Sequence, residues 1–151
     1  MKKLIFGVVF VLLLSLSSLA ADSDRKHVVL HPSATRSAFP FSDAVLVGDT
    51  LYVAGTVGFD AKTGMPPASA EQEARLAMDS LKQVIESQGM AMDDLVSVQV
   101  FCTDFSLYET FNGVYRGYFH EQFPARAFLG AASLIRGAHF EVMGVAVKRA
   151  K

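Results

Sequence analysis

The chain has 151 residues, of which 51% are hydrophobic and 19% charged, and its formal net charge is −1. This length fits one compact domain and excludes an enzyme with separate cofactor and substrate domains. A charge so close to zero argues against a protein built to neutralise nucleic-acid phosphates. The aromatic content of 11% argues against disorder.

The N-terminal 20 residues are typical of a secretory signal peptide. Two lysines precede the apolar run of residues 4–14, and small residues follow up to a cleavage site after Ala20. A membrane anchor is the alternative, but it needs roughly 20 apolar residues, and the run here has 11. We therefore expect residues 1–20 to be a signal peptide and residues 21–151 to form a single domain. The protein is then periplasmic or secreted, with no stable membrane insertion.

Removal of this segment makes the remaining domain more acidic. Loss of the two lysines takes the basic residues from 14 to 12 against 15 acidic residues, which leaves a net charge of −3. This charge further disfavours nucleic acid as a partner. Cys102 is the only cysteine, so no intramolecular disulfide can form, and its place in a strand-like run indicates a buried side chain.

The domain is predicted to contain six strands and two helices in the order β-β-β-α-β-α-β-β. Each helix is expected to begin at a capping-box pattern, Ser69 with Gln72 and Ser106 with Glu109. Apolar residues recur at helical spacing over residues 69–89 and 106–119, which predicts the two helices. Apolar or alternating runs predict strands at residues 27–30, 44–47, 51–54, 94–102, 125–131 and 139–147.

Two helices can cover only one face of such a sheet. The other face still carries apolar side chains and needs a partner, so we expect the chain to self-associate. In the fourth strand, Val96, Val98 and Val100 are expected to share one face. The charged residues of the first helix are expected to face solvent: Glu71, Glu73, Lys82 and Glu86.

Two charged residues stand in apolar strand surroundings. Arg126 cannot lose its charge and needs an anionic partner, for which a ligand and a protein carboxylate are both open. Glu141 shares a strand face with Met143 and Val145 in the most apolar stretch of the domain. A carboxylate there suits proton transfer, and a solvent-facing acid at a strand end is the alternative.

Other polar residues give weaker signals. Asn112 in the second helix can bond a ligand or a neighbouring subunit, although a mid-helix asparagine most often faces water. His27 and His31 are four residues apart in an extended segment, so they do not predict a metal site. The sequence contains no phosphate-binding loop, dinucleotide fingerprint or nucleophile-elbow motif.

Five runs, taken in order, resemble the Rid family, the RidA/YjgF type of enamine and imine deaminase. They are PFSDAV at 40–45, LYVAG at 51–55, FNGVY at 111–115, PAR at 124–126 and EVMGVAV at 141–147. The resemblance implies an α+β, chorismate-mutase-like fold with a mixed sheet, assembled as a homotrimer with active sites between subunits. It implies hydrolysis of 2-aminoacrylate-type enamines and imines to 2-keto acids and ammonia, with no cofactor or metal.

The resemblance also implies which residues form the site. Arg126 matches the arginine that binds the substrate carboxylate, and Glu141 matches the acid that positions or activates water. Gly55 and Asn112 match pocket residues. The backbone of Phe128 matches main-chain groups placed against the substrate nitrogen.

Three positions depart from the family pattern. Phe41 stands where many members carry tyrosine, Ala54 replaces a common serine, and Phe128 occupies a position often held by cysteine. Together they make the pocket more apolar and tighter. We expect an exported hydrolase of 2-imino acids. The alternative is a non-catalytic trimeric binder of small carboxylate or aromatic ligands, and a ribonuclease, disfavoured by charge, comes third.

Overall fold

The computed structural model describes residues 25–30, 40–120 and 122–149. The predicted signal peptide, residues 1–20, and His31 lie outside the described residues. None of the helices within the described ranges combines the length and the apolarity that a membrane crossing requires.

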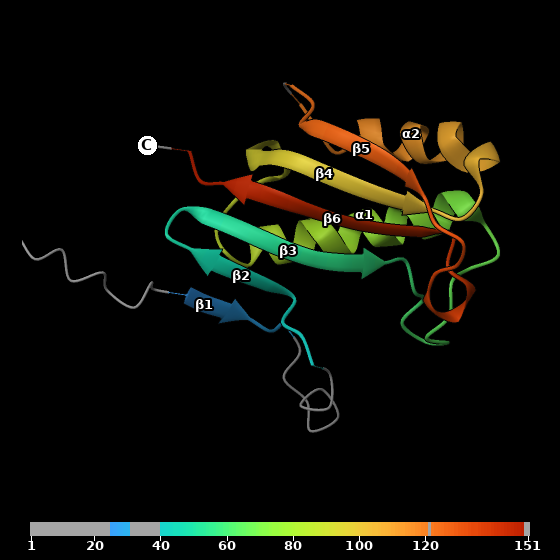
Figure 1. The fold of residues 1–151 in the computed structure, drawn as a ribbon, viewed down its shortest axis with the longest axis horizontal. Helices are drawn as coiled ribbons and strands as arrows, with labels where there is room; N and C mark the ends of the chain where they lie inside the picture. The colour runs from blue at the N-terminus through green and yellow to red at the C-terminus, as the bar shows by residue number, and fades with distance from the viewer. Residues whose placement is uncertain (1–24, 31–39, 121, 150–151) are drawn as a thin grey trace, which may run out of the picture.

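The chain forms one six-stranded mixed sheet with both helices on the same face, as the sequence predicts (Figure 1). The strand order is β1-β2-β3-β6-β4-β5, in which β4 and β5 are parallel and every other neighbouring pair is antiparallel. The elements are β1 (Arg25–Val28), β2 (Ala44–Val47), β3 (Thr50–Val57), α1 (Ala70–Glu86), β4 (Leu95–Cys102), α2 (Tyr108–Arg116), β5 (Ala125–Gly130) and β6 (Phe140–Val147).

Helix α1 begins as the sequence predicts, and α2 does not. The Oγ of Ser69 accepts a hydrogen bond from the backbone N–H of Gln72 at 3.3 Å and caps α1. Before α2, the Asp104 carboxylate accepts from the Ser106 N–H at 2.8 Å and begins a short 3-10 helix. The predicted cap at Ser106 is therefore wrong, because an aspartate two residues earlier binds its N–H first.

The prediction that Glu73 faces solvent is also wrong. Its side chain is fully buried, because its carboxylate accepts hydrogen bonds from the backbone N–H groups of His139 and Phe140. The other three charged positions are exposed, and two of them, Lys82 and Glu86, form an ion pair at 3.7 Å.

A bulge changes the expected alternation of β4. Its pairing with β6 shifts between Leu95 and Ser97, so Val96 turns to the face without helices and is 49% exposed. Val98 and Val100 are buried against the helices. The prediction that these three valines share one face is therefore wrong for Val96.

Cys102 ends β4 and is buried, as predicted. Its Sγ donates to the carbonyl oxygen of Asp104 at 3.1 Å. Burial raises the pKa of this thiol above its ordinary value, so the group stays protonated at neutral pH. Cys102 is thus a packing residue rather than a nucleophile.

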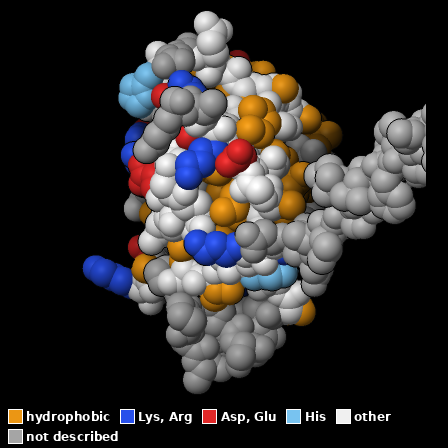
Figure 2. Space-filling view, turned by 90° about the vertical axis from the view of Figure 1, so that its left-hand side faces the viewer, with side chains coloured by type: hydrophobic (Ala, Val, Ile, Leu, Met, Phe, Trp, Pro, Cys, Tyr) orange, Lys and Arg blue, Asp and Glu red, His pale blue; other side chains and the backbone are white. Residues whose placement is uncertain are grey.

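The sheet face without helices, called the open face below, carries exposed apolar side chains. Tyr52, Val96 and Leu129 lie on it with 52%, 49% and 39% of their surface exposed. Seen from the end of the sheet in Figure 2, hydrophobic side chains gather toward this side of the molecule, on the right of the view. The open face is the surface that, from the sequence, we expect a second chain to cover.

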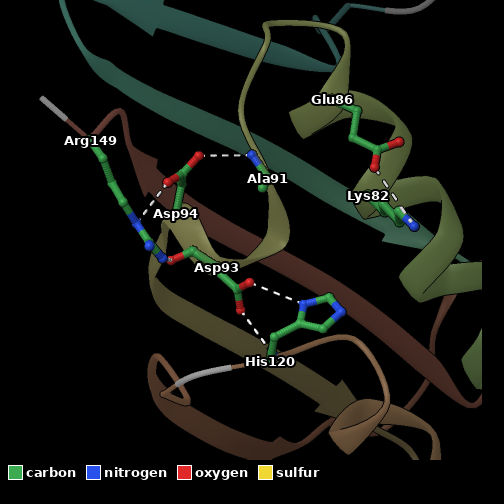
Figure 3. Close-up of polar contacts among 7 residues, drawn as sticks. All are labelled: Lys82, Glu86, Ala91, Asp93, Asp94, His120 and Arg149. Atoms are coloured by element: carbon green, nitrogen blue, oxygen red, sulfur yellow. Dashed lines mark hydrogen bonds and ion pairs between the residues drawn. The ribbon is translucent and has the colours of Figure 1, made fainter. Parts of the chain in front are cut away.

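The 3-10 helix η2 (Met92–Asp94) ties the end of β6 to the segment that follows α2 (Figure 3). Arg149 donates from Nη2 to the carbonyl oxygen of Asp93 at 2.6 Å, and its Nε pairs with Asp94 at 3.1 Å. The Asp93 carboxylate accepts from the backbone N–H of His120 at 3.0 Å and contacts its Nδ1 at 3.1 Å. These contacts hold the connection that leads into β5.

Replacement of Asp93 by asparagine should reveal how the contact between Asp93 and His120 depends on pH. Hydrogen bonds from His120 hold the pKa of Asp93 below its ordinary value of 3.8. The contact therefore stabilises the fold above that pH, and its contribution is lost as the pH falls through the lowered pKa. Thermal unfolding should give Asp93→Asn a lower Tm than the wild type at pH 7. This difference should shrink below pH 3.8, whereas the exposed Glu109→Gln should match the wild type throughout.

Candidate active site

The guanidinium of Arg126 lies at the edge of the sheet, on the helix-covered face. In the parallel pairing of β5 with β4, Arg126 stands opposite the buried Val98. Its Nη2 donates to Oδ1 of Asn112 on α2 at 2.8 Å. Its Cζ lies 4.5 Å from the centre of the Tyr115 ring, a cation–π contact. Two residues of α2 thus fix the orientation of the guanidinium.

Asn112 is 5% exposed and faces the sheet. The alternative that this asparagine faces water is wrong, because its amide oxygen is the acceptor that holds Arg126. A buried amide with a charged partner is satisfied, and it orients the planar guanidinium for contact with a second group.

The pocket beside Arg126 can receive an anion. It has a volume of about 280 Å³, and no carboxylate among the described residues forms an ion pair with Arg126. Burial raises the pKa of the Tyr115 phenol to about 12, so this tyrosine is neutral and does not compensate the positive charge of Arg126. The pocket is lined by Tyr108, Asn112, Tyr115, Arg116, Phe123, Pro124 and Arg126.

Phe128 packs beside Arg126 and against Tyr108, a residue that lines this pocket. It lies two residues after Arg126 on the same face of β5, and its ring centre is 4.9 Å from that of Tyr108 and 5.6 Å from that of Phe111. The Arg126 Cζ is 5.6 Å from the centre of the Phe128 ring. The guanidinium is thus surrounded by aromatic rings, which shield it from water and strengthen its attraction for a carboxylate.

Glu141 lies on the opposite face of the sheet. Its β6 position pairs with Val57 of β3 and Phe101 of β4, and its half-buried carboxylate sits directly over Gly55. A Cβ added to Gly55 would come within 1.9 Å of the Glu141 Oε1. A bulge in β3, between Val53 and Thr56, contains Gly55. Only glycine leaves room for the carboxylate at this point.

Phe41 belongs to the same open face as Glu141. It is 57% exposed and lines a groove of about 610 Å³. Met143, two residues after Glu141 on its face of β6, and Ala54, next to Gly55, also line this groove. The other lining residues are His27, Pro40, Ser42, Ala44, Val45, Tyr52 and Val53.

The residues predicted to form the site therefore fall into two groups on opposite faces of the sheet, called half-sites below. The arginine half-site comprises Arg126, Asn112 and Phe128 on the helix-covered face, and the glutamate half-site comprises Glu141, Gly55 and Phe41 on the open face. Within one chain the structure does not bring the arginine and the glutamate together.

The sequence reasoning missed the role of two tyrosines beside Arg126. Tyr108 and Tyr115 both line the arginine pocket, and neither was predicted as a site residue. The signal was their spacing from Asn112, four residues before it and three after it, which puts all three on one side of a helix.

This sheet with two helices on one face is the YjgF/L-PSP fold. The YjgF gene product of E. coli superposes with a TM-score of 0.74 at 29% identity, over 82% of this chain and 99% of that one. E. coli TdcF, solved with bound serine, gives 0.73 at 25% identity, over 82% of this chain and 100% of that one.

A protein-family model described as "Endoribonuclease L-PSP" matches residues 32–148, so the chain belongs to this family. A relative from Dermatophagoides farinae is 33% identical over 123 residues, which are 81% of this chain and 96% of the relative. One from Bos taurus is 31% identical over 124 residues, 82% and 90% of the two chains. Both are named 2-iminobutanoate/2-iminopropanoate deaminase. Membership of the YjgF/L-PSP family is confirmed, and the names of these relatives support an imine deaminase function in general.

Replacement of Gly55 by alanine should move Glu141 without unfolding the chain. The added methyl would overlap the end of a flexible side chain rather than backbone, so the carboxylate can swing away at little cost in stability. A crystal structure should show Glu141 displaced from β3 while Tm stays near the wild-type value. Gly113→Ala is the matched control, because a Cβ there meets nothing within 4 Å. An unmoved Glu141 in Gly55→Ala would contradict the described contact.

Proposed function

We propose that this protein hydrolyses small 2-imino acids and their enamine tautomers, of the 2-aminoacrylate type, to 2-keto acids and ammonia. The observation that carries the proposal is the Arg126 guanidinium, oriented by Asn112 in an aromatic pocket with no acidic partner among the described residues. Such a group fits a substrate carboxylate. The names of the relatives and the serine bound to TdcF, a small molecule with a carboxylate, support this substrate class.

We further propose that two neighbouring chains build each site. The arginine and glutamate half-sites lie on opposite faces of one sheet, and the open face carries apolar surface that a second chain can cover. A contact between two different faces closes into a ring when it repeats around an axis. The resemblance to the Rid family gives a ring of three, with Arg126 of one chain opposed to Glu141 of the next.

The proposed reaction needs only water and proton transfers. Arg126 holds the substrate carboxylate through two parallel hydrogen bonds. Glu141 takes a proton from water as the water oxygen attacks the imine carbon, and the π electrons of the C=N bond move to nitrogen. Glu141 passes this proton to nitrogen, which gives a neutral carbinolamine. Glu141 then takes the proton of the new hydroxyl group and delivers it to nitrogen as the C–N bond breaks, so that ammonia leaves and the C=O bond forms. Main-chain groups at Phe128, on the edge strand β5, would contact the substrate nitrogen.

The substitutions in the pocket bear on substrate choice. Phe41 and Phe128 bring aromatic rings and Ala54 a methyl group to surfaces where the family often carries a hydroxyl or thiol. These side chains favour a substrate with a small apolar side chain. We propose that the protein acts after export, because of the signal-like residues 1–20, and that nucleic acid is not its partner, because the exported domain would carry a charge of −3.

Two single substitutions should separate binding from proton transfer. Arg126→Lys should raise KM, since an ammonium cannot form both hydrogen bonds, with a loss in kcat/KM of about 100-fold. Glu141→Gln should lower kcat by about 100-fold or more, since the general base is removed. The assay measures ammonia released above the spontaneous rate from imines that an amino-acid oxidase generates in the cuvette.

Matched controls come from α1, which lies outside both half-sites. Arg75→Lys and Glu86→Gln alter exposed side chains that pair with Glu71 and Lys82, and both variants should keep wild-type kinetics. An unchanged KM and kcat/KM in Arg126→Lys would contradict the proposed mechanism. A wild-type protein that gains Tm with 2-oxobutanoate but never accelerates imine hydrolysis would instead be a non-catalytic carboxylate binder.

A further inference from the structure

Glu73 on α1 is a buried carboxylate that the proposed reaction does not use. It is fully buried, and its Oε1 accepts hydrogen bonds from the backbone N–H of His139 at 2.5 Å and of Phe140 at 3.0 Å. Its Oε2 contacts Nδ1 of His139 at 2.7 Å. A buried carboxylate with this many partners is satisfied, and breaking the set is costly.

These contacts fall immediately before Glu141. Phe140 is the first residue of β6, so the Glu73 carboxylate fixes the backbone at the point from which the Glu141 side chain departs. The carbonyl oxygen of His139 also accepts from the N–H of Thr103, which joins the same point to the end of β4.

Glu73 also meets the other strand of the glutamate half-site. A Cβ on Gly58, the residue that follows β3, would come within 2.0 Å of the Glu73 carbonyl oxygen, so α1 and this end of β3 are in close backbone contact. Thr56 adds a second link, since its Oγ1 lies 3.2 Å from the carbonyl oxygen of Ala77 and 3.0 Å from that of Val142. One turn of α1 thus holds β3 and β6, the strands that carry Gly55 and Glu141, the two residues in contact.

We propose that Glu73 is a positioning residue that sets the place of the Glu141 carboxylate over Gly55. The inference rests on the proposed function only for its kinetic consequence. Glu73 contacts neither half-site directly and acts through the backbone of His139 and Phe140. A misplacement of about 1 Å at a reacting group can cost about 100-fold in rate. The arginine half-site lies on the helix-covered face, as α1 does, but the hydrogen bonds of the Glu73 carboxylate go to His139 and Phe140 and not to Arg126, Asn112 or Phe128.

Two conservative variants test the proposal without emptying the buried site. Glu73→Gln keeps an oxygen for the two backbone donors and offers its amide to the His139 ring. It should retain kcat within about threefold. Glu73→Asp keeps the charge but withdraws it by one C–C bond, about 1.5 Å. It should lower kcat by about 10- to 100-fold. KM should stay within about twofold, because Arg126 is untouched.

A third variant separates positioning from general stability. Val84→Ala opens a cavity at the other end of α1, where the side chain is 3% exposed, and should lower Tm while leaving kcat unchanged. If Glu73→Asp and Val84→Ala lose Tm equally and neither loses kcat, Glu73 is only structural and the proposal is overturned.

A crystal structure of Glu73→Asp gives a readout that does not depend on turnover. The proposal expects the start of β6 and the Glu141 carboxylate to shift away from Gly55, and a return to the wild-type position in Glu73→Gln. Glu141 unmoved in Glu73→Asp would overturn it. If the wild-type protein hydrolyses no imine, the proposed function fails, and the position of Glu141 in these structures still decides the role of Glu73.

Discussion

The charge on Arg126 is the constraint around which the site is organised, because a guanidinium stays protonated wherever the fold places it. Among the residues that the structure describes, aromatic rings surround that charge and its hydrogen-bond partner is the neutral amide of Asn112, not a carboxylate. Its remaining donors can therefore serve an anion from outside. The Tyr115 phenol does not compensate this charge, because it is neutral at physiological pH and burial raises its pKa further, to about 12.

The second constraint is the two-sidedness of the sheet. Side chains alternate between faces along a strand, so the register that packs Arg126 beside α2 leaves Glu141 on the open face. No rotamer change moves either group to the other side. Self-association then does two things at once in the proposed assembly, because the contact that covers Tyr52 and Val96 is the contact that completes the site.

Much of the fold followed from local patterns, and the failures have physical reasons. Alternation and helical spacing predicted every strand and both helices of the described residues, although the first strand lies two residues earlier than expected. The bulge that turned Val96 outward depends on pairing with β6, which no local pattern contains. Glu73 was assigned to solvent by its charge, although it stands four residues before the buried Ala77 on the apolar stripe of α1. Apolar strand surroundings singled out Arg126 and Glu141 and the resemblance supplied their roles, whereas their separation needed the strand order.

The central claim, that two chains build each site, is tested most directly by subunit complementation. Arg126→Ala and Glu141→Gln chains, each inactive alone, are co-expressed with different tags, and assemblies that carry both tags are purified. In a ring of three that takes its arginine and its glutamate from neighbouring chains, every mixed ring rebuilds one of its three sites with both wild-type residues, about one third. The account predicts imine hydrolysis at about that fraction of the wild-type rate. Mixed assemblies as inactive as their parents would contradict it.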